Sequence, residues 1–316
     1  MKKIQLGNTD LSVAPFNLGG NAFGWTVDKA KSFTLLDHYL GKGFNFVDTA
    51  DMYSYWANGG EGGQSETIIG EWMKDRKNRH DVVLATKVGG EIGDQPINAS
   101  ANHILQGVDK SLQRLQTDYI DLYYLHYDDQ KTPVEETLEA FEKLKQAGKI
   151  RHIAASNISP ERLSESLNFS KENGISSYQV LQPLYNLVER EGYEKNYASL
   201  AKEHNLTVFP YYALASGFLT GKYRSKDDLG KSPRGQGLTQ YLHDRGLSVL
   251  NALDEISKKH NTSQAAVSLA WLASKPSIGG PIASATSTEQ LDQILQSTEI
   301  SLDQSDVEKL DSASQY

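Results

Sequence analysis

Three apolar runs of this sequence each end in an ionisable side chain. Asp48 follows FNFV, Lys87 follows VVLAT and His126 follows DLYYL. If the runs are strands of one parallel sheet, the three side chains lie along the same edge, because parallel strands end on the same side. Asp48 and Lys87 would then pair and keep each other ionised in a partly desolvated site, although such a pair can also be purely structural.

Tyr53 lies five residues beyond Asp48 and is expected to overhang the same edge. A cation beside a phenol stabilises the phenolate, so Lys87 is expected to lower the pKa of Tyr53 from its usual value of about 10. A phenol tuned in this way can donate or accept a proton near neutral pH. Taken singly, Tyr53 could also be a packed loop aromatic, since the chain has 16 tyrosines, and His126 could be a core histidine.

Three further strand-like runs end in groups that form hydrogen bonds rather than carry charge. Ser156 and Asn157 end one run, Gln182 ends the next, and Tyr211 lies near the end of a third. Polar side chains at the carboxyl ends of parallel strands are typical of a binding or catalytic site. The six strand ends together therefore predict one site at one rim of the fold.

Metal binding is the weaker interpretation of the same rim. Asp48, His126, Asp128 and Asp129 supply oxygen and nitrogen ligands, but Lys87 among them would compete with a cation. The second histidine that is common in catalytic zinc sites is also missing from this cluster. We therefore predict that the site binds no metal.

The elements that must position these residues alternate along the chain. Short β-rich runs, several of them continuously apolar as in buried parallel strands, alternate with helical patterns. The runs occupy 15–19, 44–50, 81–89, 119–126, 150–156, 178–182, 206–212 and 280–284. Eight such units predict an α/β fold that closes into a (β/α)8 TIM barrel, and no linker divides residues 1–316, so we expect a single domain. A doubly wound sheet would gather the same strand ends.

The interval between Tyr212 and Gly280 is longer than the others. It holds a loop rich in Gly, Lys and Arg at 216–237, followed by helical patterns at 246–260 and 263–274. Long loops in compact domains are usually functional, so we expect 216–245 to close over a bound ligand. Its segment GFLTGKY (217–223) follows a strand end and carries a cation, which suits a pyrophosphate.

Composition excludes several classes of function. The 316 residues include no cysteine, which excludes disulfides, a thiolate nucleophile, cysteine-ligated zinc and iron–sulfur clusters. No run of about 18 apolar residues could span a membrane, and the N-terminus does not resemble a signal peptide, so we expect a cytoplasmic protein. The excess of 40 acidic over 32 basic side chains argues against nucleic-acid binding.

Several linked motifs, in order along nearly the whole chain, resemble the aldo-keto reductase family, in particular its bacterial and potassium-channel-β-subunit-like branches. They are LGNTDLSVAPFNLGGNAFGW, FVDTADMY, TKVG, DYIDLYYLH, GKIRHIAASN, LQPLYNL, PYYALASGFLTGKY and PIASATSTEQL. The resemblance implies a (β/α)8 barrel that binds NAD(P)H without the glycine-rich dinucleotide fingerprint, which the glycines at 59–63 also fail to form. It implies a reversible reductase of aldehydes or ketones, whose partner is a small-molecule carbonyl substrate rather than nucleic acid or a membrane.

The same resemblance implies a role for each matching residue. The catalytic tetrad would be Asp48, Tyr53, Lys87 and His126, with Tyr53 as the general acid, Lys87 and Asp48 tuning it, and His126 orienting the carbonyl oxygen. The cofactor-binding residues would be Asn21, Asp48, Ser156, Asn157, Gln182, Tyr211, Tyr212, Leu214, Gly217, Lys222, Arg234, Ser284, Thr286 and Gln290. The aromatic residues near the expected mouth, which predict a substrate pocket, are Trp25, Tyr55, Trp56 and Tyr127.

The expected cofactor is NADP(H), with NAD(H) as the alternative. The stretch 281–294 contains no Lys or Arg to meet a 2′-phosphate, and Ile294 replaces a frequent asparagine of the family. Arg234 could supply the missing charge, as a loop arginine does in the channel-subunit branch. Tyr212 replaces a usual serine beside the predicted pyrophosphate loop.

Two other functions fit parts of the pattern. Some proteins of the resembled branch bind NADP(H) and act mainly as regulatory or sensor subunits, but they often lack the histidine of the tetrad, whereas His126 is present here. A phosphosugar isomerase on the same barrel would need a catalytic glutamate at a strand end, and the predicted strands offer none. The intact tetrad therefore favours an enzyme.

Overall fold

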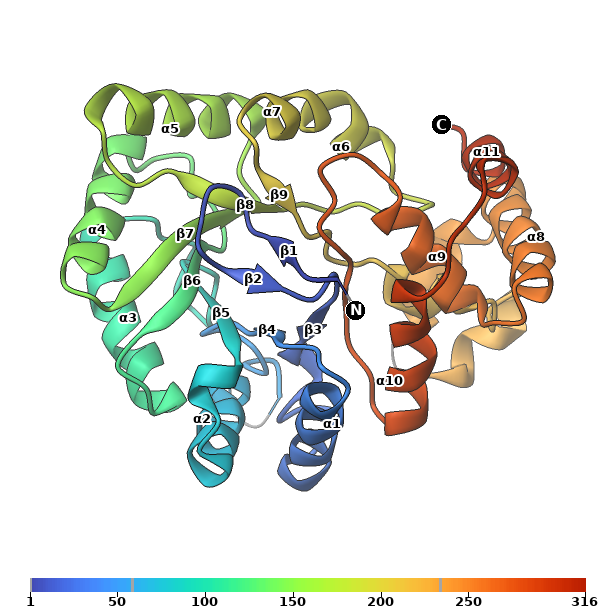
Figure 1. Ribbon diagram of the computed structural model, residues 1–316, viewed down its shortest axis with the longest axis horizontal. Coiled ribbons are helices and arrows are strands. Elements are labelled where there is room, and N and C mark those ends of the chain that lie inside the picture. The colour runs from blue at the N-terminus through green and yellow to red at the C-terminus, as the bar shows by residue number, and fades with distance from the viewer. Residues whose placement is uncertain (1, 58–59, 233–234) are drawn as a thin grey trace.

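Eight parallel strands form the centre of the protein (Figure 1). The computed structural model describes residues 2–57, 60–232 and 235–316. The strands are β3 (Asn17–Gly19), β4 (Phe46–Asp48), β5 (Val83–Val88), β6 (Ile120–Leu125), β7 (Ile150–Ser156), β8 (Tyr178–Gln182), β9 (Thr207–Val208) and β10 (Ile282–Ala283). The sheet is closed, because β10 pairs with β3 while Gly279 donates its N–H to the carbonyl of Val208 at 2.8 Å. The predicted (β/α)8 barrel is confirmed, and each strand lies within a predicted run.

Helices cover the outside of the barrel (Figure 1). They are α1 (Lys29–Gly41), α2 (Gln64–Arg76), α3 (Ala101–Leu115), α4 (Val134–Gln146), α5 (Pro160–Asn173), α6 (Glu191–Asn196), α7 (Ala198–Glu203), α8 (Asp244–Lys259), α9 (Gln264–Ala273), α10 (Thr288–Leu295) and α11 (Gln304–Ala313). Short 3-10 helices are η1 (Gly20–Ala22), η2 (Arg79–Asp81), η3 (Ala215–Thr220), η4 (Lys226–Lys231), η5 (Gly235–Tyr241) and η6 (Gln296–Thr298). Among the described helices, none is both long and apolar enough to cross a membrane.

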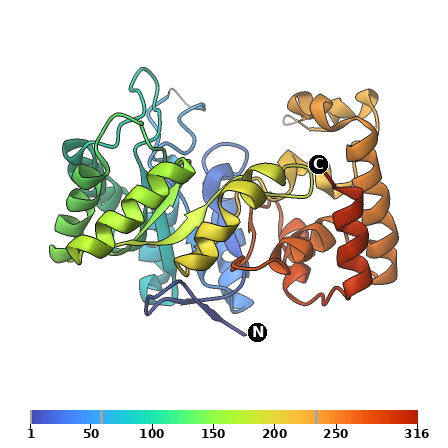
Figure 2. The same ribbon diagram turned by 90° about the horizontal axis from the view of Figure 1, so that it is seen from above.

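A hairpin that the sequence did not predict closes one end of the barrel. It consists of β1 (Ile4–Gln5) and β2 (Ser12–Val13), and it lies across the ring of strands in Figure 1. The loops after β5 and β6 lie at the opposite end (Figure 2). Hairpin and strand side chains form one interior cluster of Leu6, Leu11, Val13, Phe46, Ala85, Leu122, Tyr124, Ala154, Val180, Phe209 and Ile282. Only the end that carries the strand-end side chains is therefore left open.

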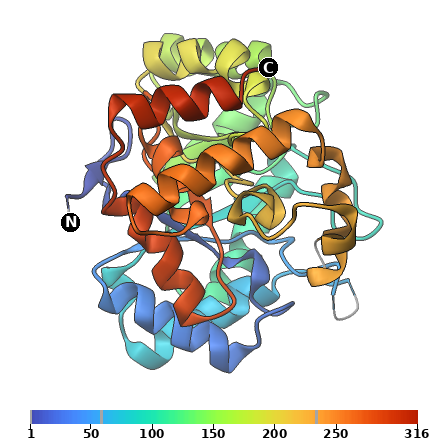
Figure 3. The ribbon, with the colours of Figure 1, turned by 90° about the vertical axis from the view of Figure 1, so that its right-hand side faces the viewer.

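The long segment between β9 and β10 is more ordered than the sequence pattern predicts. Its glycine-rich part contains η3, η4 and η5 because its apolar side chains, including Phe218, Leu219 and Leu238, are buried in the core. The two predicted helices follow as α8 and α9, and α8 packs against both α9 and α11 on this side of the barrel (Figure 3). The predicted closing loop is thus anchored to the barrel by buried residues.

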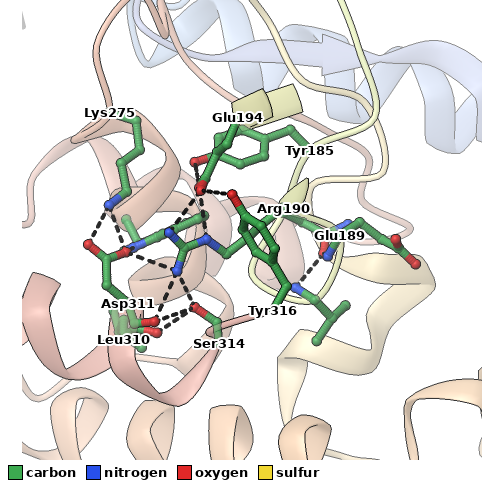
Figure 4. Close-up of polar contacts among 12 residues, drawn as sticks. Tyr185, Glu189, Arg190, Glu194, Lys275, Leu310, Asp311, Ser314 and Tyr316 are labelled. Carbon is green, nitrogen blue, oxygen red and sulfur yellow. Dashed lines mark hydrogen bonds and ion pairs between the residues drawn. The ribbon is translucent and has the colours of Figure 1, made fainter. Parts of the chain in front are cut away.

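Arg190 ties the C-terminal helix to the barrel (Figure 4). Its guanidinium donates to Glu194 at 2.8 Å, to the carbonyl of Asp311 at 3.0 Å and to Ser314 Oγ at 2.8 Å. It also lies over the ring of Trp271, 5.3 Å from the centroid. The Arg190 side chain is only 12% exposed, so these hydrogen bonds are shielded from water.

We expect Arg190→Met to lower the free energy of unfolding by about 2 kcal/mol, because charged hydrogen bonds are lost while the apolar stem is kept. Urea unfolding followed by circular dichroism measures the change. Lys195→Met is the control, since Lys195 pairs with Glu191 on the exposed surface of the neighbouring helix. Equal unfolding midpoints for the two variants would show that the hydrogen bonds of Arg190 do not stabilise the attachment of the C-terminal helix.

Candidate active site

Asp48 and Lys87 form a buried ion pair inside the open end of the barrel. Side chains of a strand alternate between its faces, so Ala85 and Lys87 of β5 point inward while Thr86 points outward to Glu66 of α2. Lys87 Nζ donates to Asp48 Oδ2 at 2.5 Å and to the carbonyl of Thr49 at 2.8 Å. Asp48 is 1% exposed and Lys87 is fully buried. The predicted pair is thus present and shielded from solvent.

Tyr53 and His126 lie next to this pair. The third polar contact of Lys87 Nζ is a hydrogen bond of 3.0 Å to Tyr53 Oη. The rings of Tyr53 and His126 are nearly perpendicular, with centroids 5.9 Å apart. His126 Nδ1 is buried and has no hydrogen-bond partner among the described residues. The four residues that were predicted to meet are brought together.

Burial dominates the electrostatics of the site. It raises the pKa of Asp48 and lowers the pKa of Lys87, while the attraction between the two charges opposes both shifts. Burial, together with the charge of Asp48, raises the pKa of Tyr53 well above 10. The lowered phenol pKa expected from the sequence is therefore wrong, because burial of the phenol and then the charge of Asp48 outweigh the positive charge of Lys87. Tyr53 is a neutral phenol that holds its proton.

His126 is neutral at physiological pH. Burial, and then the positive charge of Lys87, lower its pKa well below 6.5. Gly90, which the sequence reasoning missed, makes room for this ring. A Cβ at Gly90 would lie 2.5 Å from Met52 Sδ and 3.2 Å from His126 Nδ1. The pair of glycines, Gly89 and Gly90, at the end of the apolar run 81–89 was the signal that could have identified this position.

Two further strand ends connect to the pair through amide and hydroxyl groups. Gln182 Nε2 donates to Asp48 Oδ1 at 3.1 Å, and Ser156 Oγ donates to the carbonyl of Gln182 at 2.8 Å. β7 and β8 are in register at these two residues. Their side chains are buried, so Ser156 and Gln182 extend the polar rim around the ion pair.

Asn157 and Tyr211 complete this part of the rim. Asn157 has a positive φ of 45°, and its Nδ2 donates to the carbonyl of His126 at 2.9 Å. Tyr211 Oη donates to Asn157 Oδ1 at 3.0 Å, which leaves its half-buried ring at the barrel mouth. The hydrogen-bonding groups predicted from the sequence thus gather beside His126.

The remaining predicted cofactor residues form two separate groups. In one, Lys222 Nζ lies 3.7 Å from where a Cβ of Gly217 would be, and Leu214 accepts the Gly217 N–H at 2.9 Å. Tyr212, with φ of 59°, turns the chain just before them, and its carbonyl accepts from Asn186 Nδ2 at 3.0 Å. Arg234 lies outside the described residues. This group presents one exposed cation beside a tight turn.

The other group lies between β10 and α10, next to η1. Ser284 Oγ donates to the carbonyl of Gly19 at 2.8 Å and is hydrogen-bonded to Asn21. Thr286 Oγ1 donates to Gln290 Oε1 at 2.9 Å, so these two side chains hold the start of α10. The four predicted residues of this group are Asn21, Ser284, Thr286 and Gln290. They lie near β10, which pairs with β3 on the side away from β4.

The four predicted pocket aromatics lie around the tetrad. Trp56 contacts Trp25 at 5.7 Å, Tyr55 at 5.4 Å and Tyr53 at 6.4 Å between ring centroids. Tyr127 lies against His126 at 4.8 Å. Trp25 is 38% and Trp56 is 44% exposed, although large aromatic side chains are usually buried. An exposed aromatic wall beside a phenol is suited to a ligand with apolar surface.

Asp128 and Asp129, two of the four residues weighed as metal ligands, are engaged in hydrogen bonds. Asp128 accepts two hydrogen bonds of 2.8 Å from Arg162, and Asp129 accepts the N–H groups of Ala99 and Thr132. The site therefore offers a neutral phenol, a buried ammonium and a neutral imidazole for acid–base chemistry.

Residues 15–315 match the model of the aldo/keto reductase family. The uncharacterized oxidoreductase YqkF of Bacillus subtilis is 33% identical to this chain over 94% of it and 90% of the relative. Aldo-keto reductase YhdN of the same organism is 32% identical over 87% and 82%. A probable voltage-gated potassium channel subunit beta of Oryza sativa subsp. japonica is 32% identical over 92% and 89%. The family match includes every strand from β3 to β10.

Proposed function

We propose, because this chain belongs to the aldo/keto reductase family, that it reduces aldehydes or ketones reversibly with NAD(P)H and uses Tyr53 as the general acid. The family consists of oxidoreductases that act on small-molecule carbonyl compounds. The observation that carries the proposal is the 3.0 Å hydrogen bond from Lys87 Nζ to Tyr53 Oη at the open end of the barrel.

Tyr53 donates its Oη proton to the carbonyl oxygen, which becomes the hydroxyl of the product. The phenolate left on Tyr53 is stabilised by the ammonium of Lys87, whose burial strengthens the interaction. Asp48 keeps Lys87 charged, and the neutral His126 orients the carbonyl oxygen without adding a charge. Trp25 and Trp56 exclude water from the substrate. In alcohol oxidation the proton returns to Tyr53 by the same route.

The donors at the mouth fit the expected cofactor by their chemistry. The hydroxyl and amide groups of Ser156, Asn157 and Gln182 suit the carboxamide of a nicotinamide, and the half-buried ring of Tyr211 suits its flat ring. The exposed ammonium of Lys222 suits a phosphate. Bound NAD(P)H supplies the hydride for the carbonyl carbon, and the chain supplies position and the proton.

Single-turnover oxidation tests the proposal. Protein loaded with NADPH is mixed with a series of aldehydes, and the nicotinamide absorbance is followed. We expect the bound cofactor to be oxidised with at least one aldehyde, and turnover to continue when NADPH is in excess.

A cofactor that stays reduced with every carbonyl compound would instead support the alternative function, an NADP(H)-binding regulatory or sensor subunit. The potassium-channel subunit among the relatives is the observation that favours this second candidate.

We further propose NADP(H) as the preferred nucleotide. Near α10, the described basic side chains Lys42 and His38 both contact Asp292, at 2.9 and 2.7 Å, and 281–294 contains no Lys or Arg. The 2′-phosphate therefore depends on another cation, and Arg234 is the candidate from the sequence.

We expect NADPH to bind at least about tenfold more tightly than NADH, which corresponds to about 1.4 kcal/mol. Arg234→Ala should remove most of this difference and leave the affinity for NADH unchanged. Fluorescence quenching titrations measure both affinities, with Lys258→Ala on the exposed side of α8 as the control. Equal affinities for the two nucleotides in the wild type would refute the preference.

A further inference from the structure

Asp51 lies in the loop between β4 and α2, two residues before Tyr53, and its side chain is buried. The residue is 7% exposed, and its backbone N–H donates to the carbonyl of Lys87 at 3.1 Å. Its Oδ1 has no hydrogen-bond partner among the described residues. A buried carboxylate oxygen without a partner is costly, so the ionised form of Asp51 is disfavoured at this position.

The charges around Asp51 add to this effect. Glu66 of α2 is fully buried, and it accepts hydrogen bonds of 2.6 Å from both Thr86 Oγ1 and Arg114 Nε. The guanidinium of Arg114, on α3, is therefore already paired with one carboxylate. Burial, and then the charge of Glu66, raise the pKa of Asp51 to about 8, while Arg114 opposes the shift. Below that pH the Asp51 carboxyl is neutral.

The other groups that face Asp51 are Lys87 and Tyr123. Lys87 of β5 is paired with Asp48 inside the barrel. Tyr123 of β6 has a buried hydroxyl, and burial raises its pKa well above 10. In Asp51, burial and the like charge of Glu66 shift the pKa in the same direction.

The same cluster holds the two arms of the loop together. Gly62 and Gly63 have positive φ values of 70° and 79°. A Cβ at Gly62 would lie 2.7 Å from the carbonyl oxygen of Asp51, and a Cβ at Gly63 would lie 2.5 Å from Cδ of Arg114. The returning arm of the loop thus packs directly on Asp51 and Arg114. A shift of Asp51 would therefore move the part of the loop that leaves β4 and the part that returns to α2. Tyr53 lies between Asp51 and Gly62 in the sequence, so it would move with them.

We propose that Asp51 is a positioning residue: its neutral carboxyl, packed with Glu66 and Arg114, holds the loop so that Tyr53 Oη meets Lys87 Nζ. Ionisation places a second negative charge beside Glu66, and the carboxylate moves towards water with the loop. Tyr53 is then displaced from Lys87. The inference rests on the proposed function, because Tyr53 has to be the acid for this displacement to affect the rate.

The kinetic test is the pH profile of kcat/KM for carbonyl reduction by the wild type, Asp51→Asn and Asp81→Asn. One pH unit above a pKa of about 8, roughly a tenth of the carboxyl groups are still neutral, so the wild type should lose about tenfold between pH 7 and pH 9. Asp51→Asn is always neutral and should keep its pH 7 rate at pH 9. Asp81→Asn, an exposed carboxyl in η2, should follow the wild type. The same alkaline loss in Asp51→Asn would overturn the proposal.

Two measurements do not depend on activity. Trp56 lies on the same loop, with its ring 6.4 Å from that of Tyr53, so its fluorescence should change with a midpoint near pH 8 in the wild type and not in Asp51→Asn. The fluorescence change is assigned to Trp56 if it is absent in Trp56→Phe. A flat wild-type titration would overturn the proposal even if Asp51→Asn did not fold. If the fluorescence step is present but no variant reduces any carbonyl compound, the proposed function fails while the coupling of the loop to Asp51 stands.

The pH dependence of the protein's stability also reports the protonation of the Asp51 carboxyl. The raised pKa means that folded Asp51 keeps a proton that the unfolded chain has lost, so its contribution to stability is lost as pH rises from about 4 to about 8. We expect the melting temperature of the wild type to fall over this window relative to that of Asp51→Asn. If the melting temperatures of the two proteins change with pH in parallel, Asp51 is not a neutral carboxyl in the folded protein.

Discussion

Replacing Tyr53 with phenylalanine is expected to lower kcat for carbonyl reduction by about 10²–10⁴-fold, the usual contribution of a positioned general acid. The phenol holds its proton because burial raises its pKa, and its oxygen receives the hydrogen bond of Lys87 at 3.0 Å. Phenylalanine keeps the ring and its contact with His126 but has no proton to give. Because the change acts on the chemical step, KM and the affinity for NADPH should change little.

Steady-state kinetics with several aldehydes and fluorescence titration of NADPH check this result together. Tyr119→Phe is the matched control, since Tyr119 immediately precedes β6 at the opposite end of the strand from His126. That variant should keep the wild-type kcat. If Tyr53→Phe also keeps it, Tyr53 is not the acid and another group must donate the proton.

The second large effect is expected for Lys87→Met, which removes the ammonium and leaves Asp48 buried without its ionic partner. Breaking a fully buried ion pair in this way costs about 3–5 kcal/mol of stability, and reduction should fall at least as far as in Tyr53→Phe. Gln182 still donates to Asp48, but a neutral amide cannot replace the charge. Urea unfolding measures the loss of stability.

The pH dependence of this variant identifies the cause. Without Lys87, the folded-state pKa of Asp48 rises further above the unfolded value of 3.8, because burial is then opposed only by the hydrogen bonds of Gln182 and Tyr53. Stability is therefore lost as pH rises above about 4 and recovered as pH falls towards it. The double variant Asp48→Asn with Lys87→Met should regain most of the stability at pH 7 while staying inactive. If the double variant is as unstable as Lys87→Met, the loss came from packing rather than from the unpaired charge.

The strands, and the meeting of Asp48, Tyr53, Lys87 and His126, could be predicted from the sequence because both depend on local patterns. Strands such as β5, β6 and β7 are buried on both faces, so they appear as continuous apolar runs. The tetrad residues follow the ends of such runs, and parallel strands bring their ends to one rim. The hairpin of β1 and β2 was missed because strands of two residues carry no periodic pattern.

Properties that depend on three-dimensional surroundings could not be predicted in the same way. The sequence places Lys87 near Tyr53, but the direction of the pKa shift depends on burial and on Asp48, which outweigh the lysine. Asp51, Glu66 and Arg114 come from a loop and two helices, and no motif links them. Arg190 meets Asp311 across a separation of 121 residues, which no periodicity reveals.

The hairpin of β1 and β2 and the interior side chains packed on it close one end of the barrel, so the site beside Asp48 and Lys87 can be entered only from the other end. Cofactor and substrate that share one entrance must bind one after the other, so the molecule that binds deeper in the site has to bind first and dissociate last. If the nicotinamide is the deeper of the two, an alcohol or aldehyde that binds before the cofactor has been exchanged prevents the cofactor from dissociating. High carbonyl concentrations should then slow turnover instead of saturating it, as a direct result of two short strands at the far end of the protein.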